Sequence, residues 1–165
     1  MIALKNILVA TDFGEAAEVA LSYGRGLART FGATLHVITV VDDIGARAAT
    51  MASYGVDMGR MQLDIETAAR TQLDGLLSDE DRRELRAKAI VTRSSSPEVS
   101  IVEYATDQQI NLVIVGTHGR AGLAQFFVGS VAERVVRTAP CPVLTVRHPE
   151  REFVLPDALQ RVTPS

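Results

Sequence analysis

Three glycines and a serine at fixed spacing form a pattern that could bind phosphate groups. The spacing is Gly116, two residues, Gly119, nine residues, Gly129 and then Ser130. The pattern follows a short β-branched run and leads into a helical pattern, which predicts a strand, a glycine-rich loop and a helix start. Backbone amides in such a loop, and the positive end of a helix, are groups that hold phosphate oxygens. These residues therefore predict a phosphate-binding site.

Two better-known phosphate-binding motifs do not fit this stretch. A Walker A loop ends in Gly-Lys-Ser or Gly-Lys-Thr, and the chain contains neither triplet. The dinucleotide-binding fingerprint follows the first strand of its fold, whereas these glycines follow the fourth predicted strand. The spacing and the position of the glycines are therefore the signal.

Side chains next to the glycines could contact the same ligand, and each also has a simpler interpretation. His118 could donate to a phosphate or act as a general acid or base, or contribute only its backbone amide. Arg120 could pair with a phosphate tail or be a solvated surface residue. Ser130, with Glu133 three residues later, also has the pattern of a helix capping box. Both interpretations stay open for each of the three residues.

Asp12 is the acidic candidate and follows the first predicted strand. Its carboxylate could accept hydrogen bonds from ribose hydroxyls or help to hold a metal ion. With Glu15 three residues later, it could instead cap the helix that follows. The two roles do not exclude each other.

Five apolar runs predict strands, and the segments between them predict helices. The expected strands are 7–10, 34–41, 88–92, 112–115 and 143–147. The expected helices are 15–30, 61–76, a segment that starts at Pro97, and 130–139, with an added turn within 78–86. Residues 42–60 form a connection without a clear pattern. Because strands and helices alternate, the sequence predicts an α/β fold with a parallel sheet covered on both faces.

The first helix illustrates how a buried face is predicted from spacing. Apolar residues recur three and four positions apart, and this spacing places them on one side of a helix. The predicted face comprises Ala16, Val19, Ala20, Tyr23 and Leu27. Gly24 and Gly26 weaken the helix and indicate close packing on the sheet.

The composition is that of an ordinary globular protein and excludes several classes. Of 165 residues, 47% are hydrophobic and 22% charged, and the net charge of −3 disfavours a broad nucleic-acid or membrane surface. No apolar run approaches a membrane span. The N-terminus lacks the features of a signal peptide, and the single cysteine, Cys141, cannot form an internal disulfide. We therefore expect a cytoplasmic protein with one domain over 1–147 and a tail over 148–165.

The glycine spacing resembles that of the universal stress protein family, in its ATP-binding branch. The segments A-T-D-F at 10–13 and P-C-P-V-L-T-V at 140–146 are also similar to that family, and the resemblance covers about residues 3–147. It implies a doubly wound, five-stranded parallel sheet with strand order 3-2-1-4-5. In that order, the loops after strands 1 and 4 meet where the strand order reverses, which is where ligands bind in such sheets.

The resemblance also implies a ligand and its contacts. The ligand would be ATP, or ADP or AMP, with Mg²⁺ or Mn²⁺ carried by the phosphates and Ser130 as a candidate metal contact. Asp12 would hold the ribose and Val37 would pack on the adenine. The other implied nucleotide contacts are Ala10, Thr11, Gly116, His118, Gly119, Arg120, Gly129, Ser130 and Val131.

These features predict a nucleotide-dependent regulator in the stress response. The family resemblance implies a homodimer formed through the last strand, 143–147, and a downstream protein partner that the sequence does not identify. Two alternatives remain. One is a slow ATP hydrolase or another nucleotide-processing enzyme, for which His118 and Arg120 are the nearby candidates. The other is a dimeric scaffold in which the glycines only shape the loop.

Overall fold

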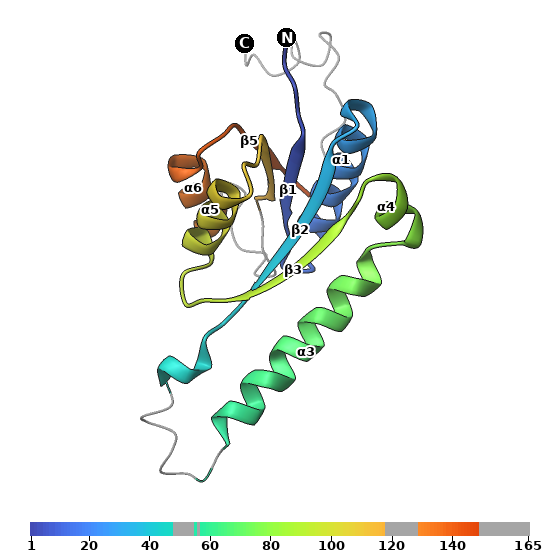
Figure 1. The fold of residues 1–165 in the computed structure, drawn as a ribbon. Helices are drawn as coiled ribbons and strands as arrows, with labels where there is room; N and C mark the ends of the chain where they lie inside the picture. Colours follow the sequence, from blue (N-terminus) through green and yellow to red (C-terminus); the bar gives the residue numbers. More distant parts are fainter. Residues whose placement is uncertain (48–54, 56, 118–128, 149–165) are drawn as a thin grey trace, which may run out of the picture.

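The computed structural model describes residues 1–47, 55, 57–117 and 129–148. Strands and helices alternate along this part of the chain (Figure 1). The elements are β1 (Asn6–Ala10), α1 (Glu15–Phe31), β2 (Thr34–Val41), η1 (Ile44–Arg47), α3 (Met58–Leu76), α4 (Asp79–Glu84), β3 (Lys88–Arg93), α5 (Pro97–Asp107), β4 (Leu112–Gly116), α6 (Ser130–Thr138) and β5 (Val143–Val146). Among the described residues, no helix is both long and apolar enough to cross a membrane.

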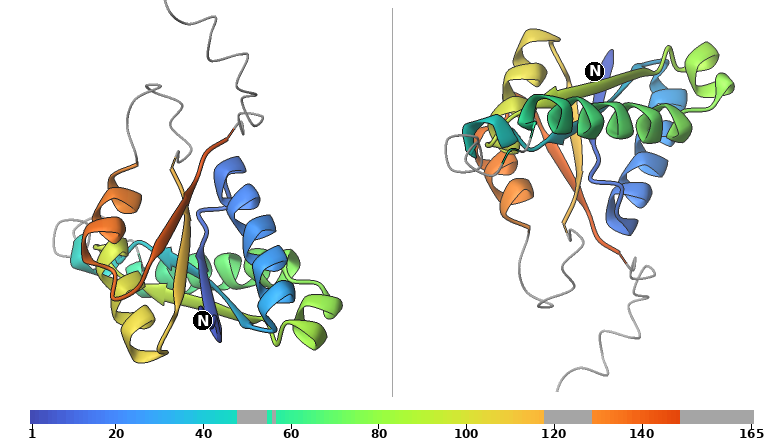
Figure 2. Two further views of the ribbon diagram at one scale, coloured as in Figure 1. Left: turned by 90° about the horizontal axis from the view of Figure 1, so that it is seen from above. Right: turned by 90° about the horizontal axis from the view of Figure 1, so that it is seen from below.

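The five strands form one parallel sheet with the order β3-β2-β1-β4-β5. This confirms the predicted doubly wound sheet and its strand order. Helices α1 and α3 cover one face, and α5 and α6 cover the other (Figure 2). The core is correspondingly divided into two apolar clusters, one on each face of the sheet.

Strand β1 ends in the middle of the sheet, between two neighbouring strands that both continue beyond it. Ala10 pairs with Ile38 of β2 on one side and with Val115 of β4 on the other. One further hydrogen bond, from the Thr11 amide to the Ile38 carbonyl at 2.9 Å, closes this end of the strand. Since β2 continues to Val41, the chain leaves β1 at a recess between β2 and β4.

Helix α1 lies very close to the sheet because two glycines provide the space. A Cβ atom at Gly24 would lie 2.5 Å from Cγ2 of Val9. A Cβ atom at Gly116 would lie 2.8 Å from the carbonyl carbon of Ala16. Real Cβ atoms do not approach other atoms this closely, so neither position accepts a side chain without movement of its neighbours. The N-terminus of α1 is thereby held against the end of β4.

The buried face of α1 is rotated from the predicted one. Its buried residues are mostly small: Ala16, Ala17, Ala20, Leu21, Gly24 and Ala28. Tyr23, predicted to be buried, is 45% exposed. Gly26 has open space around it, so the prediction of close packing is right for Gly24 and wrong for Gly26. Small side chains bring the helix near the sheet and displace the large ones toward the rim.

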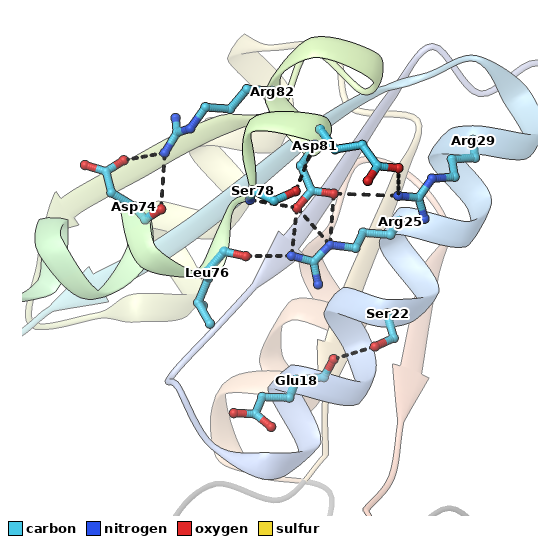
Figure 3. A network of polar contacts seen from close by, with 10 residues as sticks. Glu18, Ser22, Arg25, Arg29, Asp74, Leu76, Ser78, Asp81 and Arg82 are labelled. Carbon is cyan, nitrogen blue, oxygen red and sulfur yellow. Dashed lines mark hydrogen bonds and ion pairs between the residues drawn. The ribbon is translucent and has the colours of Figure 1, made fainter.

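A buried ion pair ties α1 to the junction between α3 and α4 (Figure 3). Arg25 Nη2 lies 2.8 Å from Asp81 Oδ2 and 2.6 Å from the Leu76 carbonyl, and Arg25 Nε donates to both carboxylate oxygens. Asp81 is 2% exposed, and its carboxylate also accepts from the Ser78 amide at 3.1 Å. Burial alone would raise the pKa of Asp81, but the hydrogen bonds from Arg25 and Ser78 outweigh it and hold the pKa below its usual value.

His36 links β2 to α5 on the other face of the sheet. The ring is 1% exposed, and its Nδ1 lies 2.8 Å from the Tyr104 hydroxyl. Burial, with a smaller contribution from the charge of Lys88, lowers the pKa of His36 to about 4. The ring is therefore neutral at physiological pH, and the C-terminal half of α5 is fixed to the sheet through Tyr104.

The edge strand β3 is covered by a side chain of α3. The Arg70 guanidinium donates to the Ala89 carbonyl at 2.9 Å. In a parallel strand, alternate residues direct their backbone groups to opposite sides, and the bond from the Ser94 amide to the Val41 carbonyl assigns the even-numbered residues to β2. The Ala89 carbonyl therefore faces outward, and Arg70 occupies it.

Candidate functional site

A cavity of about 540 Å³ lies at the carboxyl ends of β1, β2 and β4, between α5 and α6. This is the point at which the strand order reverses, where ligands bind in open α/β sheets. Of the predicted contact residues, the structure brings seven together here: Ala10, Thr11, Asp12, Gly116, Gly129, Ser130 and Val131.

One wall of the cavity is apolar. Ile38 and Val40 contribute from β2, Pro97 and Ile101 from α5, and Val115 from β4. Ile101 is fixed by the core beneath it, where it belongs to the same buried cluster as Ile38 and Val115. Such a wall suits a flat, weakly polar group such as a nucleobase.

The structure places Val37 elsewhere. Its side chain is fully buried in the cluster beneath α1 and α3, on the opposite face of the sheet from the cavity. Side chains alternate between faces along a strand, so Ile38 and Val40 occupy the cavity face of β2. Val37, for which an adenine contact was predicted, therefore does not line the cavity, whereas its neighbours Ile38 and Val40 do.

Asp12 stands at one end of the cavity, in the loop between β1 and α1. Its Oδ1 accepts a hydrogen bond from the Gly14 amide at 2.9 Å, and the neighbouring Thr11 Oγ1 accepts from the Phe13 amide at 3.0 Å. These two short-range bonds fix the loop, in which Phe13 has a positive φ of 63°. The exposed Asp12 side chain lines the cavity, so a ligand can reach its carboxylate.

The predicted capping boxes do not form at either helix start. The N-cap of α1 is Gly14, not Asp12, and the N-cap of α6 is Gly129, not Ser130. Both N-cap residues are glycines and so have no side chain that could cap the helix. The capping-box interpretations of Asp12 and Ser130 are therefore wrong, and the Asp12 carboxylate bonds instead to the Gly14 amide before the helix begins.

The N-terminus of α6 forms the other polar end of the cavity. The Gly129 amide donates to the Thr117 carbonyl at 2.8 Å, which joins the helix start to the end of β4. The next amides, those of Ser130, Val131 and Ala132, belong to the first turn, where amides have no partner within the helix. Together with the helix dipole, they suit an anionic group such as a phosphate.

Part of the predicted site lies outside the described residues. These residues are His118, Gly119 and Arg120. Gly116 is described, and the proximity of Ala16 already requires a glycine there. The first glycine of the motif is thus explained by packing, whether or not it also contacts a ligand.

The lining residues fit an adenine nucleotide better than a metal bound by the protein alone. Among the residues that the structure describes, no group of three or more His, Cys, Asp or Glu side chains could hold a metal ion. Asp12 is the carboxylate that lines the cavity in this part of the chain. A metal ion here would be coordinated mainly by the phosphates of a ligand, with the Ser130 hydroxyl as a contact from the chain.

Two features of the site were not predicted from the sequence. One is the apolar wall that α5 contributes, and the other is which residues of β2 face the cavity. The run from Thr34 to Val41 is almost continuously apolar because both faces of the sheet are covered, so it carries no alternation from which a phase could be assigned. Pro97 was predicted as the first residue of α5, which the structure confirms, but its place in the cavity depends on the packing of α5 against α6.

Comparison with known proteins gives a consistent result. Over 150 residues, the chain is 31% identical to a universal stress protein of Methanocaldococcus jannaschii, with 90% of this chain and 85% of the relative covered. The structure resembles the universal stress protein UspA from Lactobacillus plantarum, with a TM-score of 0.67 and 24% identity over 89% of this chain and 100% of the other.

A further structure with the same fold contains a nucleotide. It is a universal stress protein from Archaeoglobus fulgidus in complex with dAMP, with a TM-score of 0.60, 20% identity, and coverage of 88% of this chain and 99% of the other. The sequence profile of the universal stress protein family matches residues 3–147. The chain described here therefore belongs to the universal stress protein family.

Proposed function

We propose that this protein binds an adenine nucleotide, ATP in the first place, and acts as a nucleotide-dependent regulator in the stress response. One observation carries the proposal: a carboxylate and a helix N-terminus stand at the polar ends of one cavity whose wall is apolar. The dAMP complex of the similar Archaeoglobus fulgidus protein supports the ligand class.

Each part of the nucleotide has a counterpart in the cavity. The base packs on Ile38, Val40 and Ile101, and the Asp12 carboxylate accepts hydrogen bonds from the ribose hydroxyls. The phosphates bind the first-turn amides of α6, where Ser130 stands. Mg²⁺ or Mn²⁺ carried by the phosphates would neutralise part of their charge, which brings the triphosphate closer to the Asp12 carboxylate at lower electrostatic cost.

The described groups of the site bind and orient a ligand. They are backbone amides, one carboxylate that holds a sugar, and apolar side chains, all fixed on the ends of strands and helices. Groups that bind the nucleotide are sufficient for a regulator. A partner protein that recognises the nucleotide-bound form responds to binding itself, without any chemical reaction of the nucleotide. We therefore propose nucleotide binding, and not turnover, as the function of these residues.

Replacement of Asp12 by asparagine tests the ligand assignment. Asparagine keeps an oxygen that can accept from the Gly14 amide, so the loop is retained, but it removes the negative charge and one acceptor. Hydrogen bonds to charged groups contribute about 1.5–3 kcal/mol, so Asp12→Asn should weaken ATP binding roughly tenfold or more. Isothermal titration calorimetry with Mg²⁺–ATP measures this.

The control for this experiment is Glu18→Gln. This substitution removes a carboxylate from the exposed side of the first turn of α1, and Glu18 does not line the cavity. Its affinity for ATP should equal that of the wild type. Equal affinity in Asp12→Asn and wild type would refute the role of Asp12. Absence of ATP binding in the wild type would refute the proposed function itself.

We further propose that β5 forms the contact between two copies of the chain. The Val113 amide donates to the Pro142 carbonyl and the Thr117 amide donates to the Val146 carbonyl, so the even-numbered residues of β5 face β4. The amide of Thr145, between them, therefore faces the outer edge. Exposed sheet edges tend to pair with another strand.

Replacement of Thr145 by proline should reduce dimerisation. Proline removes the outward amide but none of the hydrogen bonds between β4 and β5, and edge strands tolerate it. We expect the wild type to sediment as a dimer and Thr145→Pro to sediment mainly as a monomer at the same concentration. Thr145→Val, which keeps the amide, should remain dimeric. A wild-type monomer, or a dimer that survives the proline, would contradict the proposal.

A further inference from the structure

We propose that the ion pair between Glu98 and Arg134 is a latch that holds α5 and α6 at the separation the nucleotide requires. This inference rests on the proposed function, because it assigns a positioning role around the same cavity. Both residues stand next to the cavity lining and do not belong to it. Their effect on a ligand would therefore be transmitted through the two helices.

The geometry of the latch is close and asymmetric. Arg134 Nη1 lies 2.6 Å from Glu98 Oε1. The Glu98 side chain is 12% exposed, whereas that of Arg134 is 65% exposed. The arginine thus reaches from the surface of α6 to a carboxylate that is largely covered at the start of α5.

The position of the latch connects it to both walls of the cavity. Glu98 follows Pro97, which lines the cavity at the first turn of α5. Arg134 stands one helical turn after Ser130 and close behind Val131, both of which line it from α6. A change in the distance between the two partners therefore changes the distance between the apolar wall and the amides proposed to bind phosphate.

The carboxylate partner is fixed in its ionised form. Its own backbone amide and the Arg134 guanidinium hold the pKa of the Glu98 carboxyl below its usual value. A negative charge in the first turn of α5 also interacts favourably with the helix dipole. Glu98 is therefore the covered, charged partner on α5, and Arg134 is the exposed partner on α6.

Helix α6 needs such a link more than α5 does. Helix α5 is fixed to the sheet by the buried Ile101 and Ala105 and by Tyr104, which contacts His36. Helix α6 has nine residues, no side-chain cap, and two buried residues, Ala132 and Val135. Short helices depend on tertiary contacts for their stability, so a polar link in the second turn of α6 stabilises its first turn as well.

The chain offers a matched control on the same helix. Arg137 Nη2 lies 2.8 Å from Glu133 Oε1, so the residue types and the distance are similar to those of the latch. This pair connects two positions of α6 to each other and spans no gap between elements. Both of its side chains are more than half exposed, and such pairs contribute little to stability.

The experiment compares Mg²⁺–ATP affinity in the full chain by calorimetry. We expect Arg134→Gln to weaken binding at least threefold, Arg134→Lys to stay within twofold of the wild type because it keeps the charge, and Arg137→Gln to bind as the wild type does. Hydrogen exchange of the nucleotide-free proteins provides the second measurement. The amides of the first turn of α6 should exchange faster in Arg134→Gln than in Arg137→Gln.

Each other outcome has a distinct meaning. If the wild type binds ATP and Arg134→Gln binds equally well, the latch is refuted and the proposed function stands. Equal losses in Arg134→Gln and Arg137→Gln would point to a general charge effect and also refute it. A loss of affinity in Arg134→Gln with unchanged hydrogen exchange would also refute the latch, because the loss would then not arise from a change in α6. No ATP binding by the wild type would overturn the proposed function and the latch together.

Discussion

Replacement of Gly116 by valine should destabilise the fold by about 3 kcal/mol, because the new side chain would overlap the backbone of α1. The first atom of that side chain, Cβ, would already lie 2.8 Å from the Ala16 carbonyl carbon and 2.9 Å from its Cβ. A flexible side chain could rotate away, but a helix backbone packed on the sheet cannot. Urea unfolding followed by circular dichroism measures the loss.

The matched variant is Gly26→Ala, in α1. Apart from its chain neighbours and the backbone of its own helix, no atom of the described residues lies within 4 Å of the Cβ position at Gly26, so alanine should stabilise the protein by roughly 0.5–1 kcal/mol through its higher helix propensity. A loss of stability in Gly116→Val and a gain in Gly26→Ala would show that the space around the Cβ position decides the effect of each substitution. If Gly116→Val unfolds at the wild-type urea concentration, α1 does not pack on β4 as described.

This result bears on the interpretation of the glycine motif. If mutation of Gly116 abolishes nucleotide binding, displacement of α1 is enough to explain the loss. The loop with Asp12 joins β1 to α1, so a shift of the helix would also move Asp12. Gly129 is a milder case, since a Cβ there would lie 3.3 Å from the Thr117 carbonyl oxygen. The same sequence motif therefore combines a packing requirement and a ligand requirement, and stability must be measured before affinity is interpreted.

Replacement of Arg25 by methionine should cost about 3–5 kcal/mol at neutral pH, because it leaves the buried Asp81 carboxylate without its counter-ion. The carboxylate is 2% exposed and depends on Arg25 for three of its hydrogen bonds. Methionine keeps most of the aliphatic volume, so the loss reports the charge and the hydrogen bonds more than the packing. Denaturant unfolding at pH 7 provides the measurement.

The pH dependence distinguishes this explanation from a packing defect. In the wild type the pKa of Asp81 is lowered from 3.8, so its contribution is fully present above that pH and is lost as the pH falls through the folded-state pKa. In Arg25→Met, burial favours the protonated form of the Asp81 carboxyl. Acidification therefore removes the buried charge and with it part of the loss of stability. The stability difference between the two proteins should therefore shrink as the pH falls toward 3.

An exposed pair in the same region provides the control. Arg82 Nη2 lies 2.9 Å from Asp74 Oδ1, and the side chains are 39% and 47% exposed (Figure 3). Arg82→Met should cost less than about 1 kcal/mol at any pH, because water screens the pair. A similar loss in both variants, or a difference for Arg25→Met that does not depend on pH, would contradict the assigned role of Asp81.

The sequence was sufficient for the strands and their order. The strand predicted at 34–41 is found with the same bounds, and the others differ by one residue at an end. Short β-branched runs separated by helical patterns carry this information locally. The strand order followed from the family resemblance, which rested on the glycine spacing and the segments at 10–13 and 140–146.

The details that failed depend on tertiary packing. The capping boxes at Asp12 and Ser130 had the right residue types, but each helix begins at a position set by its approach to the sheet, and glycine becomes the N-cap. Tyr23 has the right spacing for the buried face of α1, yet alanines and Gly24 occupy that face because the helix lies close. The spacing of apolar residues identifies a helix, but it does not fix which way the helix is rotated about its axis to within one residue.

The bond between Arg70 and the Ala89 carbonyl has a consequence for how far assembly can proceed. A sheet with two free edges can add copies at both ends and grow into an open ribbon, whereas a sheet with one available edge stops at a closed pair. Because Arg70 occupies an outward carbonyl of β3, the edge opposite β5 lacks one of the acceptors that an incoming strand would need. The Arg70 guanidinium on α3 therefore makes the β3 edge a poorer partner for a further strand than an edge with all of its outward acceptors available.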